Sequence, residues 1–158
     1  MALSKIQAES MNLADTFAFT GTVTGAGEAV EEGTWTPAMS SFNHTTQVGR
    51  YLKIGKIIVV HATIVGTSTR SGGGVTVSGL PYATNSTANF YQSAVIGGHS
   101  YVGFTSANML GLTCRLDPNN TYFAFLRYRH NSNMDGLQAT QQGTSTQTFY
   151  VGATYIAN

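Results

Sequence analysis

Hydrophobic and polar residues alternate along most of the chain from Gly33 onward. The clearest example is KIIVVHATIVG, in which Ile58, Val60, Ala62 and Ile64 occupy every second position. Successive side chains of a β-strand point to opposite faces, so this period of two predicts a strand with one buried face. Further segments show the same period or a short apolar run between turn residues: GTWTPAM, RYLKIG, GGGVTVSGLP, FYQSAVIGG, MLGLTCRL, TYFAFLRYR and QTFYVGATYIA. Together they predict about seven or eight strands.

Turn residues separate these segments at short intervals. Asp117-Pro118-Asn119-Asn120 joins MLGLTCRL to TYFAFLRYR. Asp at the first position and Pro at the second favour a type I turn, so the two segments are predicted to form a hairpin. No helical period occurs after residue 15, and no internal repeat is visible. The pattern therefore predicts an all-β fold, an antiparallel β-sandwich of the jelly-roll kind.

Several of the predicted strands are apolar or aromatic on both faces, notably KIIVVHATIVG and YFAFLRYR. A strand of a two-layered sandwich needs only one buried face, so the second face calls for another partner. We therefore expect close contact between subunits. An oligomer would also protect the strand edges, which few charges defend in this chain.

Residues 1–32 differ from the remainder of the chain. They contain most of its acidic residues and no proline, and Phe17, Phe19 and Val23 follow the period of two. A segment with one apolar strand cannot form a core by itself, so we expect an N-terminal arm over 1–32 that lies on a neighbouring subunit or a larger assembly. The β domain is then expected over 33–158. The arm's predicted attachment residues are Ile6, Met11, Leu13, Phe17, Phe19 and Val23.

Charge is scarce throughout the protein. Only 9% of residues are Asp, Glu, Lys or Arg, whereas 42% are hydrophobic and 11% aromatic; an average soluble domain has roughly 25% charged residues. The net charge of +1 provides no long-range field to attract nucleic acid or acidic lipid. The acidic residues at 28–32 and the basic residues at 127–130 are both interpreted as solvated faces.

No apolar stretch is long enough to form a membrane helix, and the N-terminus lacks the continuous apolar region of a signal peptide. We therefore expect a protein that is made in a cytoplasm and does not insert into a membrane.

Each candidate constellation for catalysis lacks a required part. The G-x-S-x-G elbow is absent, and GGHSYVG at 97–103 is only a partial match. Glycoside cleavage needs two carboxylates, but beyond the arm only Asp117 and Asp135 remain, and both are interpreted as turn residues. Cys114, in an apolar run, is predicted to be a packed core thiol. We expect no enzyme, catalytic residue or cofactor.

Nucleic-acid and metal sites are equally unsupported. Arg127 and Arg129 would share one face of their strand while Tyr128 points to the other, so no stacking platform forms. The four histidines never fall at short ligand spacing. His61 would be the candidate for a metal on the axis of a trimer, but a hydrogen-bonded strand histidine is the preferred interpretation.

Four stretches resemble a known module. GTWTPAM, QVGRYLKIGKIIVV, VTVSGLPYAT and FYVGATYIAN resemble, in order and spacing, the β module at the C-terminal ends of bacteriophage tail-fibre and other virion surface proteins. The pattern is G-T-W-T-P, Q-x-G-x-Y-x-K-I-G and G-L-P, and it covers residues 33–158. The arm is similar to linker segments of phage structural proteins, particularly those of phages that infect cyanobacteria and other aquatic bacteria.

The resemblance implies a homotrimeric β-sandwich packed about a threefold axis. Residues that match the pattern are interpreted as fold and trimer residues and not as a binding site. Two aromatic residues of the predicted hairpin, Phe123 and Phe125, are added to this set. The expected fold and trimer core is therefore Trp35, Tyr51, Ile54, Leu80, Pro81, Phe123 and Phe125.

The resemblance leaves two roles open. A tail fibre usually carries a long trunk before this module, whereas about 30 residues precede it here, so we favour a capsid decoration (cement) protein whose arm contacts the major capsid protein on the virion surface. The alternative is a short tail fibre or receptor-binding protein. It would recognise a host cell-surface glycan through the polar loops 66–74, 82–90 and 131–146.

Overall fold

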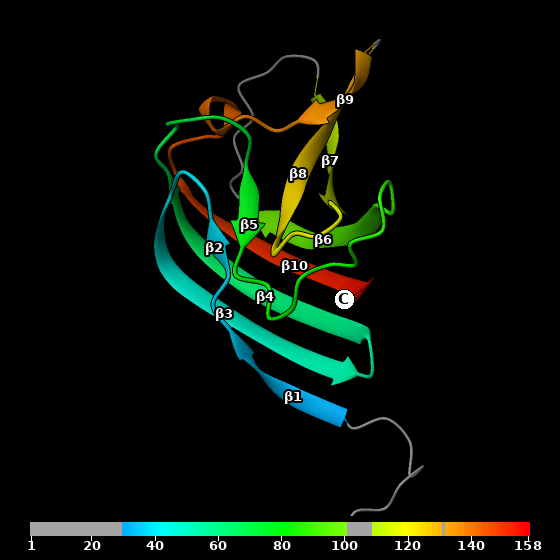
Figure 1. Cartoon of the computed structure of the whole chain (residues 1–158). Coiled ribbons are helices and arrows are strands. Elements are labelled where there is room, and N and C mark those ends of the chain that lie inside the picture. The colour runs from blue at the N-terminus through cyan, green and yellow to red at the C-terminus, as the bar shows by residue number, and fades with distance from the viewer. Residues whose placement is uncertain (1–29, 101–108, 131) are drawn as a thin grey trace, which may run out of the picture.

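The computed structural model describes residues 30–100, 109–130 and 132–158 (Figure 1). In this part of the chain all strand pairings are antiparallel, and ten strands belong to one sheet in the order β1-β3-β4-β10-β6-β7-β8-β5-β2, with β9 paired to β8. The predicted all-β antiparallel class is therefore confirmed. The strands are β1 Val30–Trp35, β2 Ala38–Met39, β3 Phe42–Ile54, β4 Ile57–Ser68, β5 Thr76–Ser78, β6 Gln92–Ser100, β7 Met109–Leu116, β8 Tyr122–Arg129, β9 Ser132–Gly136 and β10 Thr146–Ile156, and a 3₁₀ turn spans Ala139–Gln141.

The sheet curls so that its two ends face each other. β1, β3, β4, β10 and β6 form one broad curved layer, and β2, β5 and β8 lie across its inner side (Figure 1). β6 belongs to both layers, because its residues up to Ala94 pair with β7 and those from Ala94 onward pair with β10. One continuous sheet, and not two separate sheets, thus forms both layers.

The period of two correctly identified the buried face of the central strands. On β4 the side chains of Ile58, Val60, Ala62 and Ile64 are buried and point between the layers. The same alternation buries every second residue of β10 from Gln147 to Tyr155. Side chains on the opposite face of both strands are half-buried or exposed, apart from a buried glycine on β10.

Aromatic rings join the two layers in the core. The ring of Phe149 on β10 contacts the rings of Phe42 on β3 and Phe125 on β8, with centroids 6.1 and 5.5 Å apart in edge-on geometry. Phe125 and Phe149 are fully buried. Edge-on aromatic pairs of this kind contribute about 0.5–1.5 kcal/mol beyond the burial of their surface.

The β7–β8 hairpin forms as predicted, with Leu116 opposite Phe123. Its turn is not type I, however. Asn119, the third turn residue, has a φ of 56°, whereas a type I turn requires a negative φ there and a type II turn a positive one. Asparagine tolerates this left-handed conformation better than most residues. The prediction failed because it considered only the first two turn positions.

Two further boundaries differ from the sequence-based expectation. β1 begins at Val30, which pairs with Ile54, so residues 30–32 of the predicted arm belong to the sheet. Range 131–146, interpreted as a polar loop, contains β9 and the 3₁₀ turn. Residues 1–29, with all six predicted attachment residues, lie outside the described residues, and their role stays a prediction.

Candidate interaction surface

The outer face of the broad layer is covered by no other element of the described chain. We define the open face as the outward-pointing residues of β1, β3, β4, β10 and β6, to which the register assigns aligned rows. One row at its end is aliphatic throughout, and all of its side chains are exposed. This row is Val30, Ile54, Ile57 and Ile156.

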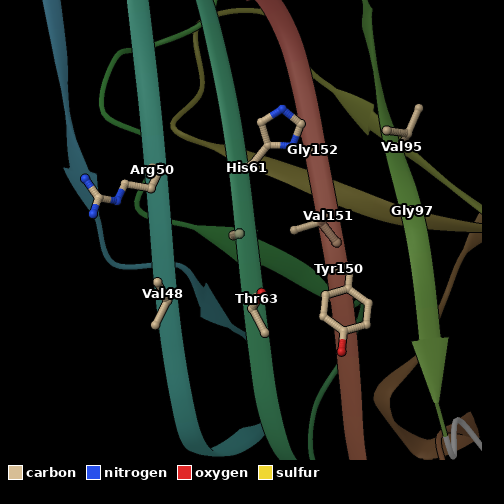
Figure 2. Close-up of a pocket in the computed structure, with 10 residues that line it drawn as sticks. Val48, Arg50, His61, Thr63, Val95, Gly97, Tyr150, Val151 and Gly152 are labelled. Carbon is tan, nitrogen blue, oxygen red and sulfur yellow. The ribbon is translucent and has the colours of Figure 1, made fainter.

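The central row of the open face combines different chemistries. Arg50 of β3 lies opposite His61 of β4, His61 opposite Gly152 of β10, and Gly152 opposite Val95 of β6. Figure 2 shows Arg50, His61 and Val95 around the position of Gly152, with Tyr150 further along the same strand. Val95 is 62% exposed and Tyr150 is 53% exposed.

Gly152 makes the open face hollow. It has no side chain, and a Cβ built there would lie 3.0 Å from Nδ1 of His61. The resulting groove, of about 360 Å³, is bordered by side chains of the central row and of the adjacent row, which contains Val48, Thr63 and Tyr150. A glycine inside a strand commonly marks a place where another group approaches the backbone closely.

The open face has little charge to desolvate. Along the described strands it contains one acidic residue, Glu32, and one basic residue, Arg50, in addition to His61. Arg50 forms no ion pair with any residue of the described chain. Charged residues are depleted at the centre of protein–protein interfaces, so this composition is typical of a contact surface.

The residues of the virion-module pattern meet on the inner side of the same layer. Gly49 lies opposite Trp35, where a Cβ would come within 2.5 Å of the indole nitrogen. The side-chain amide of Gln47 donates to the carbonyl of Pro37 over 2.8 Å. The indole of Trp35 donates to the carbonyl of Arg50 over 3.3 Å. The motifs G-T-W-T-P and Q-x-G-x-Y-x-K-I-G therefore pack against each other where β1 pairs with β3.

Glu31 connects Tyr82, the residue that directly follows the G-L-P motif, to the same junction. Its Oε1 accepts hydrogen bonds from the hydroxyls of Tyr51, at 2.7 Å, and Tyr82, at 2.6 Å. Lys53 pairs with Oε2 at 3.4 Å and lies over the ring of Tyr82. The two tyrosine hydroxyls, and then Lys53, lower the pKa of Glu31, while the carboxylate raises the pKa of Tyr51 to about 12. We call Glu31, Tyr51, Tyr82 and Lys53 the β1 latch.

The predicted fold and trimer residues divide into three groups by burial. Trp35, Leu80, Phe123 and Phe125 are buried within a single chain. Tyr51 and Pro81 are half-buried. Ile54 is exposed and belongs to the aliphatic row of the open face.

Both carboxylates considered for catalysis are held in ion pairs. Asp117 Oδ1 is 2.6 Å from Nε of Arg115. Asp135 binds Arg127 through two hydrogen bonds of 2.7 and 2.9 Å and also contacts Arg129 at 2.9 Å. These hydrogen bonds, chiefly those from Arg127, lower the pKa of Asp135.

The interpretation of Asp135 as a turn residue is wrong, because Asp135 lies in β9 opposite Arg127. Arg127 is buried, so the expectation of a solvated basic face also fails there. Opposite charges eight residues apart, with Asn131 and Asn133 between them, were the signal for this missed hairpin.

The remaining candidates show no arranged chemistry in the ranges that the structure describes. Cys114 is buried as predicted, and burial raises the pKa of its thiol to about 12. No group of three or more His, Cys, Asp or Glu side chains in these ranges is placed to hold a metal ion. None of the helices found there has the length and apolar character to span a membrane.

Comparison with known proteins gives no relative: no family model matches the chain, and neither a curated protein nor a solved structure matches it significantly.

Proposed function

We propose that this chain is a non-enzymatic structural protein of a bacteriophage that works as a homotrimer on the virion surface, as a capsid decoration protein. The observation that carries the proposal is the open face, a broad and nearly uncharged surface of mainly aliphatic and threonine side chains on a single chain, with an exposed aliphatic row at one end. Large exposed apolar patches mark interaction sites, because leaving them in water is unfavourable.

The packing of the pattern residues supports the resemblance to virion surface modules. Trp35 packs on Gly49, Gln47 donates to the carbonyl of Pro37, and the β1 latch adds Tyr82, the residue that follows G-L-P. Residues with such packing specify a fold and not a catalytic centre. The ion pairs of Asp117 and Asp135 likewise support a role without acid–base chemistry.

The partners in this proposal are two further copies of the chain and other virion proteins, above all the major capsid protein. The arm that precedes β1, over residues 1–29, attaches the trimer to the capsid, and the β-sandwich domain provides the contacts between subunits. The protein is made in the host cytoplasm and is located on the assembled particle.

A short tail fibre or receptor-binding protein is the second candidate, and a specific feature favours it. Phe90 and Tyr91 are exposed beside the polar segment 82–90, and the guanidinium of Arg115 lies 4.7 Å from the Tyr91 ring centroid. Exposed aromatic rings with polar neighbours provide apolar faces with a hydrogen-bonding rim, as the recognition of a cell-surface glycan requires.

Quantitative mass spectrometry of purified virions distinguishes these roles. A copy number comparable with that of the major capsid protein supports decoration. A copy number comparable with that of the tail proteins, together with labelling at the tail by immunogold, supports the fibre. Absence of the protein from purified particles would overturn both.

The attachment arm is tested in the full-length chain with Phe17→Asp and Phe19→Asp combined. The expected result is a protein with the oligomeric state of the wild type that no longer binds particles lacking their own copy. The matched control is Tyr128→Asp, an exposed aromatic of β8, which should leave particle binding unchanged. Wild-type binding by the arm variant would show that other residues make the attachment.

A further inference from the structure

A protruding ring and a hollow lie side by side on β10. Tyr150 and Gly152 are two residues apart, so both belong to the open face. Tyr150 is 53% exposed, while the groove beside it runs over Gly152 between His61 and Val95. When a projection lies directly beside a hole on one surface, the projection of one copy can fill the hole of another copy.

The size and lining of the groove favour a protein side chain over a small-molecule ligand. Its volume of about 360 Å³ is near the lower limit of ligand pockets, which enclose about 300–1,000 Å³. Its borders include Val48, Val95 and the ring of Tyr150. An aromatic side chain fits such borders, since it brings a large apolar area at a low cost in conformational entropy.

The extent of the open face matches what one protein partner covers. With about 4.8 Å between strands and about 3.3 Å per residue, its strands present roughly 800 Å² in projection. A standard interface buries about 800 Å² of accessible surface per partner. The scarcity of charge means that covering this surface desolvates few ions, and the aliphatic row extends the apolar area to the edge strand β1.

We infer that the open face is where copies of this chain meet, with Tyr150 of one copy entering the groove over Gly152 of another. The inference rests on the homo-oligomeric part of the proposed function and is independent of any location on a virion. Covering the face removes the exposed aliphatic row and Val95 from water, which supplies the driving force. Tyr150 fixes the register between copies.

Sedimentation velocity of the full-length protein over a concentration series tests the inference. The wild type should sediment at a multiple of the chain mass of 16.8 kDa. Tyr150→Ala removes the projection and should raise the dissociation constant about tenfold or more, as at an interface hot spot. Val95→Asp places a charge at the border of the groove and should give monomers.

Tyr128→Ala is the matched control, because Tyr128 on β8 has a similar exposure of 48% but lies outside the open face. It should leave the dissociation constant within about twofold of wild type. All altered side chains are exposed in the single chain, so circular dichroism and the melting temperature of diluted protein should show the fold retained.

The outcomes separate the inference from the proposed function. A wild type that stays monomeric at every concentration overturns both. An oligomer that Tyr150→Ala and Val95→Asp leave intact overturns the inference alone. A photo-crosslinking amino acid at position 150 gives an independent measurement: crosslinks between chains should map to peptides of β3, β4, β6 or β10, and crosslinks to β7 or β8 of the other chain would contradict the inference.

Discussion

Gly49 allows the single tryptophan of the chain to pack against β3. Trp35 is directly opposite Gly49 in the register, and the indole covers the space that a side chain at position 49 would need. Two residues earlier in β1, the ring of Tyr51 lies over Gly33 in the same way. Both positions of the pattern require glycine because an aromatic ring packs on the backbone there, and not because the backbone conformation is unusual.

Gly49→Ala should destabilise the protein by about 1–3 kcal/mol, the usual cost of inserting a methyl group into a packed site. A Cβ at position 49 would lie 2.5–2.7 Å from atoms of the buried Trp35 ring. Gly111→Ala on β7 is the control, since nothing lies within 4 Å of its Cβ position. Urea unfolding followed by the fluorescence of Trp35 measures both variants, and equal stabilities would disprove the packing argument.

Buried charge is the residue-scale feature that alternation could not reveal. Arg127 occupies a position of β8 that the period of two leaves ambiguous, and its burial depends on Asp135 of the next strand. Alternation gives no sign of the pair, because it forms between β8 and the short polar strand β9. Such a strand has too few apolar residues to give a period.

At the scale of elements, β1 is an edge strand that depends on side-chain interactions as well as on its ladder with β3. The β1 latch joins it through Glu31 to β3 and to the segment that contains Tyr82. The latch spans sequence separations of 20 and 51 residues for its two tyrosines. Its bond to Tyr82 therefore requires that segment to be packed against β1 and β3, whereas the bonds to Tyr51 and Lys53 require only the pairing of β1 with β3.

Glu31→Gln should lower the melting temperature near neutral pH, and the difference from wild type should vanish in acid. Because the folded state lowers the pKa of Glu31, the unfolded chain binds its proton more tightly. The stabilisation is therefore present above the ordinary pKa of 4.5 and is lost as the pH falls through the lower folded value. Melting curves from about pH 3 to pH 8 measure the difference.

Glu32→Gln provides the control for the latch, since Glu32 is exposed on the open face and lies next to Glu31 in the chain. Both variants are compared with the wild type in dilute solution, where contact across the open face does not contribute, and the melting temperature of Glu32→Gln should follow that of the wild type over the same pH range. If Glu31→Gln and Glu32→Gln behave alike, the hydrogen bonds from the two tyrosines do not stabilise the folded state.

At the scale of the whole molecule, the distribution of charge sets how copies should associate. The ion pairs of the described chain involve Glu31, Asp117 and Asp135, and none of these carboxylates belongs to the open face. Apolar contact is insensitive to ionic screening, whereas contact between charged surfaces weakens steeply with salt.

The dissociation constant of the oligomer should therefore change by less than about threefold between about 0.05 and 0.5 M NaCl. It should decrease in ammonium sulfate, because sulfate strengthens the burial of apolar surface. Sedimentation velocity in each buffer provides the measurement. A loss of association with rising NaCl would instead place the contact on charged residues outside the open face.

The sequence by itself determined the all-β antiparallel class, the buried face of β4 and β10, and the β7–β8 hairpin. Each of these follows from alternation or from turn residues within a few positions of one another, so neighbouring residues carry the whole signal. The apolar second face of KIIVVHATIVG was also visible, and Val59, Val65 and the exposed Ile57 lie on it.

Only the tertiary structure decided which strands distant in the chain lie side by side. β10, the last strand, lies between β4 and β6, and this position aligns Arg50, His61, Gly152 and Val95 in one row. Arg50 and His61 belong to consecutive strands, but Gly152 and Val95 are far from them in the chain, and no local pattern encodes the register that joins all four. The groove over Gly152 and the β1 latch depend on such long-range pairings, which form when burial of the shared core brings distant segments together.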